Sequence, residues 1–244
     1  MESGKLANGS SCVEFGAGSS TSSVYLGIKG FHVDAVDISQ LAIDRAKTLP
    51  HSDTVNWICA DLLDPSLFDT VLQTEHYDFV LDMQCFHCLR DFNEIKAAQN
   101  IYRALKPGGY VMVIVGAADP TGEVTLHTQH APGPPKLTLN ALREPLEACG
   151  LTTLQISLTR FNNTDHYASL PHGLPPLAWV GIFQRIDWKT PPPQSLQQQQ
   201  QQQHDNQSLH TATYALEVQA PYSTYILQGR KTVETRGYPL PPAL

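Results

Sequence analysis

Residues 12–18 read Cys-Val-Glu-Phe-Gly-Ala-Gly, and five hydroxyl-bearing residues follow at positions 19–23. The run that ends at Phe15 predicts a buried strand. Gly16 and Gly18 permit a tight strand-to-helix turn and the close approach of a ligand to the backbone. The serines and threonine are able to cap the helix that follows, which satisfies its first N–H groups. Such a turn suits a nucleoside ligand without phosphates better than a dinucleotide.

Short apolar runs alternate with helix-like stretches from this turn to about residue 116. The predicted strands are 12–15, 33–36, 55–59, 79–81 and 110–115, and the predicted helices are 20–29, 40–48, 65–73 and 91–105. Strands that alternate with helices across short connections predict right-handed crossovers and a parallel sheet covered on both faces.

The pattern changes in the second half of the chain. Thr138 is placed to cap a helix that runs to Cys149, with Gly150 as the residue that ends it. Two strand-like runs follow, over 154–160 and 178–185, and no helix separates them. We therefore predict an α/β fold with a doubly wound, mostly parallel, seven-stranded sheet that ends in an antiparallel hairpin.

Acidic residues stand at or near the carboxyl ends of four successive predicted strands: Glu14, Asp37, Asp61 and Asp82. A single acidic residue at such a position is most often a turn or helix cap. Four of them beside a glycine turn favour a ligand site, because ligands bind at this edge of open α/β sheets. Asp37 follows the glycine turn by about twenty residues, where a carboxylate is placed to bind ribose hydroxyls.

Five segments in this order resemble the class I S-adenosylmethionine-dependent methyltransferases: VEFGAG, VDAVDIS, CADLLD, YDFVLD and LKPGGYVMVIV. The resemblance covers residues 11–186 and implies S-adenosyl-L-methionine as cofactor. It implies that Glu14, Gly16 and Gly18 line the methionine end, that Asp37 holds the ribose, that Ile38 packs on the adenine, and that Asp61 and Leu62 face the adenine amino edge. The antiparallel hairpin also belongs to that fold.

The segment DMQCFHCLR, residues 82–90, resembles the D-x-G-C-F-H-x-L segment of the thiopurine and tellurite-resistance methyltransferases, with Gln84 in place of the glycine. This implies a small, soft methyl acceptor, such as a sulfur or selenium compound. A thiolate needs mainly alignment and exclusion of water. The catalytic residue is therefore not fixed by the sequence; if a base is needed, Asp82 and His87 are the candidates.

Cys85, His87 and Cys88 also form a candidate metal-binding cluster. A closed zinc site needs four ligands, usually as two separated pairs, and the chain shows one cluster with a phenylalanine inside it. We expect these side chains to pack beside a pocket and expect no metal.

The end of the chain has a different composition. Residues 187–213 contain three successive prolines and a glutamine tract at 197–203, which predicts a disordered linker. Residues 214–244 resemble the opening of an ASCH domain, through Pro221-Tyr222 and the pattern G-x-K-x-x-E-x-R from Gly229 to Arg236. The match covers about a third of such a domain. RNA binding is expected only of a complete one.

The composition of the chain excludes some classes of function and location. The formal charge of −7 argues against a broad surface for nucleic acid or anionic membranes. The five cysteines and the polar N-terminus predict a cytoplasmic protein with reduced thiols and no membrane segment. Two alternatives stay open: a nicotinamide enzyme, disfavoured by Thr21 where a third glycine is usual, and a non-catalytic nucleoside- or RNA-related adaptor with a degenerate methyltransferase fold.

Overall fold

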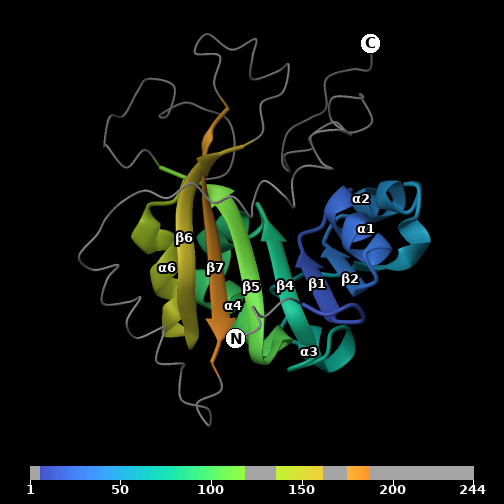
Figure 1. Ribbon diagram of the computed structural model, residues 1–244, viewed down its shortest axis with the longest axis horizontal. Helices are drawn as coiled ribbons and strands as arrows, with labels where there is room; N and C mark the ends of the chain where they lie inside the picture. Colours follow the sequence, from blue (N-terminus) through green and yellow to red (C-terminus); the bar gives the residue numbers. More distant parts are fainter. Residues whose placement is uncertain (1–5, 119–135, 162–174, 187–244) are drawn as a thin grey trace.

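The computed structural model describes residues 6–118, 136–161 and 175–186 (Figure 1). The strands are β1 (Ser11–Phe15), β2 (His32–Asp37), β3 (Val55–Cys59), β4 (Tyr77–Met83), β5 (Leu105–Gly116), β6 (Leu151–Arg160) and β7 (Leu177–Arg185). The helices are α1 (Thr21–Ile28), α2 (Gln40–Ala46), α3 (Leu67–Thr70), α4 (Phe86–Ala104) and α6 (Leu139–Ala148), with a 3-10 turn, η1, at Ser52–Thr54.

The strands form one seven-stranded sheet in the order β3-β2-β1-β4-β5-β7-β6. Strands β1 to β5 pair in parallel, and β7 lies antiparallel between β5 and β6. The predicted fold class is therefore confirmed, including the terminal antiparallel pair. The strand order reverses beside β1, between β2 and β4, which places the carboxyl ends of these strands next to the point where ligands bind in such sheets.

Two apolar clusters lie on the two faces of the sheet. One contains Phe68 of α3, Ile101 of α4 and Leu142 of α6, packed against strand residues such as Val80 and Val113. The other contains Val24 and Leu26 of α1, packed against residues such as Val33. Figure 1 shows α6 and α4 on the side of the sheet away from the viewer and α1 and α2 near its β1–β2 end. The sheet is thus held from both faces, as buried parallel strands require.

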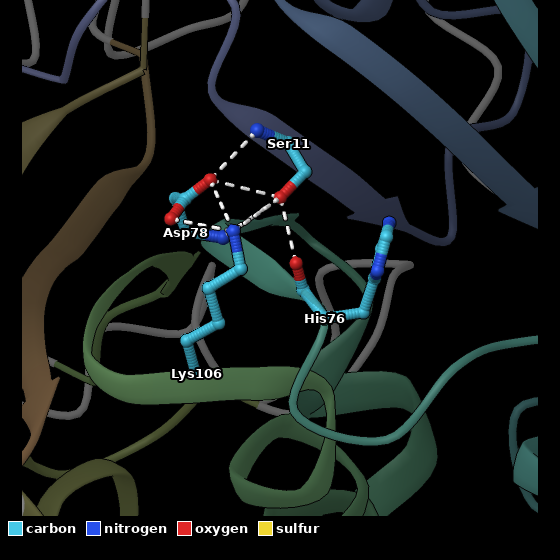
Figure 2. Close-up of polar contacts among 4 residues, drawn as sticks. All are labelled: Ser11, His76, Asp78 and Lys106. Atoms are coloured by element: carbon cyan, nitrogen blue, oxygen red, sulfur yellow. Dashed lines mark hydrogen bonds and ion pairs between the residues drawn. The ribbon is translucent and has the colours of Figure 1, made fainter.

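A polar network joins the amino ends of β1, β4 and β5 (Figure 2). The Asp78 carboxylate accepts hydrogen bonds from the Ser11 amide, at 2.8 Å, and from the Lys106 ammonium, at 2.9 Å. The Ser11 hydroxyl lies 2.7 Å from the His76 carbonyl oxygen. This edge is opposite the one that carries the predicted ligand site, so the network is structural.

Two helices have different ends in the structure from those that the sequence predicts. The predicted helix 91–105 begins earlier, at Phe86, and its backbone leaves helical geometry at Asn93. The Asn93 side chain accepts the Lys96 N–H at 2.9 Å and starts the second part of the helix as a cap does. Sequence reading found only that second part. The predicted helix 65–73 is shortened to α3.

The predicted linker 187–213 and the ASCH-like segment 214–244 lie outside the described residues. The five cysteines all lie in the described residues, and none of them forms a disulfide there. In the part of the chain that the structure describes, no helix is both long and apolar enough to cross a membrane.

Candidate functional site

The turn between β1 and α1 is the first part of the site. Gly16 and Gly18 have φ angles of 69° and 58°, in the region that favours glycine. A Cβ atom added to Gly18 would meet nothing within 4 Å, so this backbone faces open space. The turn is pinned to β2, because the Ala17 N–H donates to the Val36 carbonyl at 2.9 Å. The predicted glycine turn therefore exists and leaves room for a ligand beside it.

Glu14 lies beneath this turn and is only 2% exposed. Its two carboxylate oxygens accept hydrogen bonds from the Ser20 and Ser23 hydroxyls. Ser20 is also the N-cap of α1, since its oxygen accepts the Ser22 N–H at 3.0 Å. The serine-rich start of α1 thus provides the cap that the sequence predicts, and it holds a buried carboxylate in place.

Asp37 ends β2 and is fully buried. One oxygen accepts the Gly18 N–H at 2.5 Å, and the other accepts the Ser39 N–H at 2.8 Å. The side chain therefore ties the glycine turn to the end of β2. An ionised carboxylate has about four acceptor positions. Two of them are used by these bonds, which hold the carboxylate at the glycine turn.

The three residues predicted to surround the adenine differ in solvent exposure. Ile38 is 60% exposed and lies directly after β2. Leu62 is 5% exposed and belongs to the apolar cluster that includes Phe68. Asp61 is exposed, and its carboxylate accepts the Leu63 N–H at 2.8 Å. The structure places Ile38 and Asp61 at the same edge of neighbouring strands, while Leu62 forms part of the core below that edge.

Asp82 lies near the carboxyl end of β4 and is 1% exposed. Its Oδ1 accepts the Cys85 and Phe86 N–H groups at 3.0 and 2.9 Å. Its buried Oδ2 has no hydrogen-bond partner among the described residues. Burial raises the pKa of Asp82 to about 7; the two N–H bonds act in the opposite direction, and the charge of Glu14 adds to the rise.

His87 lies in the first turn of α4 and is 1% exposed. Its Nδ1 accepts the Gly116 N–H, from the end of β5, at 3.1 Å. A neutral imidazole that accepts at Nδ1 carries its proton on Nε2. In this arrangement the lone pair of His87 is already engaged, whereas the second oxygen of Asp82 is not. The two candidate bases that the sequence did not distinguish, Asp82 and His87, therefore differ in their hydrogen bonding.

Lys136 is a residue of this edge that sequence reading did not single out. Its neighbour Leu137 pairs with the end of β5, through bonds of 2.8 Å to the Gly116 oxygen and from the Ala118 N–H. A Cβ atom on Gly116 would lie 3.6 Å from Lys136 Cγ and 3.7 Å from His87 Nδ1. The lysine stem and the imidazole therefore flank the same glycine. Proximity to the Thr138 cap was the available signal, since crossover helices start at the ligand-binding edge of the sheet.

The next feature is the candidate metal-binding cluster around Cys85. Among residues 6–118, 136–161 and 175–186, no set of three or more His, Cys, Asp or Glu side chains is placed to hold a metal ion. The Cys85 thiol is buried, and burial raises its pKa well above the usual range, with further contributions from the charges of Asp82, Cys88 and Glu14. Cys85 is therefore present as a neutral thiol.

Residues 13–111 match the family model of a methyltransferase domain. These residues contain the glycine turn, Asp37, Asp61 and Asp82. Over these residues the chain therefore carries a methyltransferase domain. No curated protein matches the sequence of this methyltransferase.

Solved structures share the fold of the methyltransferase at low sequence identity. A TehB-like methyltransferase from Corynebacterium glutamicum is 20% identical, with a TM-score of 0.50 over 74% of this chain and 82% of that one. TehB from Haemophilus influenzae is 16% identical, with a TM-score of 0.56 over 73% of this chain and 58% of that one. A protein described in the conversion of a disulfide bond into a thioacetal group during echinomycin biosynthesis is 22% identical, with a TM-score of 0.56 over 81% and 83%.

The residues at the carboxyl edge fit S-adenosylmethionine. The open space at Gly18 is a place where a side chain is absent and a ligand can contact the backbone. The buried carboxylates of Glu14, Asp37 and Asp82 suit a ligand that carries a sulfonium and an ammonium group, because buried anions are stabilised by a nearby cation. The hydroxyl cap at Ser20 replaces the phosphate that a dinucleotide would place at this helix.

Proposed function

We propose that this methyltransferase transfers a methyl group to a small-molecule nucleophile, a sulfur or selenium compound, at the carboxyl edge of β1, β2 and β4. In this proposal Glu14, Gly16 and Gly18 line the methionine end of the cofactor. Asp37 binds the ribose, and Ile38, Asp61 and Leu62 surround the adenine. The observation that carries the proposal is the buried Asp82 oxygen without a partner among the described residues, beside an open glycine turn.

Bound S-adenosylmethionine supplies a methyl group that its sulfonium activates. The acceptor's lone pair would form the new bond to that carbon in line with the carbon–sulfur bond that breaks, with S-adenosylhomocysteine as the leaving group. The protein has to align the two partners and exclude water. A thiol acceptor must also lose its proton at or before this step.

Asp82 is the group that we assign to that proton. A pKa near 7 makes its carboxylate available at neutral pH and able to hold a proton afterwards. His87 is assigned a positioning role, because its Nδ1 accepts the Gly116 N–H and links the start of α4 to the end of β5. An acceptor sulfur beside Asp82 Oδ2 would give this buried oxygen a hydrogen-bond donor.

The acceptor class has two supports. The segment 82–90 resembles that of the thiopurine and tellurite-resistance methyltransferases, with the buried Asp82, Phe86 and His87 at matching positions. One protein of similar fold is described in the conversion of a disulfide to a thioacetal, a reaction at sulfur. Both supports point to a soft nucleophile.

Cofactor binding tests the assigned site. We expect calorimetry on the full chain to detect S-adenosylmethionine and not NAD. Asp37→Ala removes the ribose acceptor and the anchor of the Gly18 turn, and we expect the affinity to fall by about tenfold to a hundredfold, since a bond to a charged group is worth about 1.5–3 kcal/mol.

Asp44→Ala is the matched control, because Asp44 is an exposed carboxylate of the neighbouring helix α2 that bonds only to Gln40 among the described residues. It should bind the cofactor as the wild type does. Equal affinity in the Asp37→Ala and Asp44→Ala variants would refute the assigned ribose site. The absence of binding in the wild type would favour the non-catalytic adaptor.

A further inference from the structure

The residue that follows Lys136 is fixed by three hydrogen bonds. This residue, Leu137, is 1% exposed, and the Leu137 carbonyl accepts both the Ala118 N–H and the Trp179 indole N–H at 2.8 Å. The Leu137 N–H donates to the Gly116 carbonyl at 2.8 Å. These bonds fix the backbone beside Lys136 to the carboxyl end of β5, so the lysine cannot leave this edge of the sheet.

The Lys136 charge is not used elsewhere in the described structure. Its stem packs against Gly116, with Cγ 3.6 Å from the position of a Cβ on that residue. Among residues 6–118, 136–161 and 175–186, its ammonium makes no hydrogen bond or ion pair. A lysine ammonium without an anionic partner beside a ligand site is available to bind an anionic group of a ligand.

Lys136 and Asp82 both lie near the carboxyl end of β5 but do not neutralise each other. Asp82 pairs with Val113, and the Gln84 N–H donates to the Ile114 carbonyl at 2.8 Å, which puts Asp82 beside the last residues of β5. The influences on the pKa of Asp82 are burial, the N–H groups of Phe86 and Cys85, and the charge of Glu14; the lysine is not one of them. The His87 ring approaches the same Gly116 that the Lys136 stem contacts.

We infer that Lys136 binds a carboxylate, or an equivalent anionic group, of the methyl acceptor while Asp82 faces the acceptor's nucleophile. The acceptor is then a small thiol or selenol acid in which a short spacer separates the nucleophile from the acid group. This inference rests on the proposed function. In the transfer step the thiol proton passes to the Asp82 carboxylate, the sulfur lone pair forms the new bond to the methyl carbon, and the bond to the sulfonium breaks.

The first test compares a thiol acid with its uncharged ester: 3-mercaptopropionate and its methyl ester, with the full chain and S-adenosylmethionine. We expect the wild type to prefer the acid. Lys136→Met should lower kcat/KM for the acid about fivefold, mainly through KM, and leave the ester unchanged, which is the range of a partly exposed ion pair. Lys136→Arg should retain the preference. Lys47→Met, at an exposed lysine that follows α2, is the matched control and should change neither rate.

Direct binding separates this inference from the proposed function. With S-adenosylhomocysteine present, calorimetry should show that 3-(methylthio)propionate binds the wild type about fivefold more tightly than it binds Lys136→Met. Equal binding to both proteins, or equal loss of both thiols' rates in the variant, would overturn the inference. Binding that depends on Lys136 without methylation of either thiol would support the anion site and refute the thiol acceptor.

Discussion

Asp82 combines full burial with a charge at neutral pH. Its pKa is raised from 3.8 to about 7, because burial penalises the carboxylate more than the two backbone N–H groups stabilise it. Between these two pH values the folded state binds more protons at Asp82 than the unfolded chain does. The contribution of Asp82 to stability therefore falls as pH rises from about 4 to about 7, and levels off above that.

Asp82→Asn removes this penalty and also removes the proposed base. We expect the variant to be more stable than the wild type at pH 8, by on the order of 1–3 kcal/mol, and to lose that advantage at pH 5. Methyl transfer to a thiol should fall by about 10²–10⁴-fold, the usual contribution of a general base. Urea unfolding at the two pH values measures the first effect. An advantage of the same size at both would show that Asp82 is not the group that titrates.

Gln84 is an example of what one sequence predicts, and does not predict, about a single residue. The resemblance to D-x-G-C-F-H places a glycine there, and the structure gives the reason, since Gln84 has a φ angle of 68°. The sign of a backbone angle is not readable from one sequence. The same holds for Glu14 and Asp37: their positions at strand ends were predictable, but their bonds to Ser20, Ser23 and Gly18 depend on tertiary contacts.

At the scale of elements, the sheet is anchored at its amino edge by the network of Ser11, Asp78 and Lys106. Partial burial raises the pKa of Asp78, but hydrogen bonds from Lys106 and Ser11 and the lysine charge outweigh it, and the net shift is downward. Stability from a carboxyl with a lowered pKa is present above the unfolded value, near 4, and is lost as pH falls through the folded value.

Lys106→Met should therefore destabilise the fold by about 1 kcal/mol at neutral pH, and the difference from the wild type should shrink as the pH falls below the unfolded pKa of Asp78, near 4. Both side chains are partly exposed, which limits the effect. Arg143→Met provides the comparison, because the Arg143–Glu147 pair joins two residues of one exposed helix face and should contribute less than about 0.5 kcal/mol. A pH-independent loss in Lys106→Met would instead indicate lost packing of the lysine stem.

The elements themselves were predictable to the extent that their signals are local. All seven strands and the Thr138 cap of α6 follow from apolar runs and capping chemistry. The first part of α4 was missed because Cys85, its N-cap, forms no side-chain cap bond. The carboxylate that accepts N–H groups at this start belongs to Asp82, three residues earlier at the end of β4. The end of α3 was overestimated because an apolar run continues after the helix, through Val71 and Leu72.

At the scale of the whole molecule, Arg185 links the end of the last described strand to the rest of the domain. It lies at the end of β7, is 9% exposed, and donates to the Tyr102 and Leu105 carbonyls at 3.2 and 2.7 Å. Its guanidinium also pairs with Glu75 and stacks over the Tyr102 ring, 4.1 Å from the ring centroid. The last described strand is thus joined to the α4–β5 junction and to the loop before β4, which supports our proposal of a domain boundary at residue 186.

Arg185→Leu in the full chain should cost about 2–4 kcal/mol of unfolding free energy, because it leaves two backbone carbonyls and the Glu75 carboxylate without their donor. Arg185→Lys should recover only part of this, since an ammonium cannot reproduce the planar fork that reaches three acceptors at once. Arg103→Leu is the control: Arg103 makes a cation–π contact with Phe68 at 4.5 Å, worth about 0.5–1 kcal/mol. Urea midpoints of the three variants decide the matter. If Arg185→Leu proves no more harmful than Arg103→Leu, Arg185 is not the closing contact and the boundary must lie elsewhere.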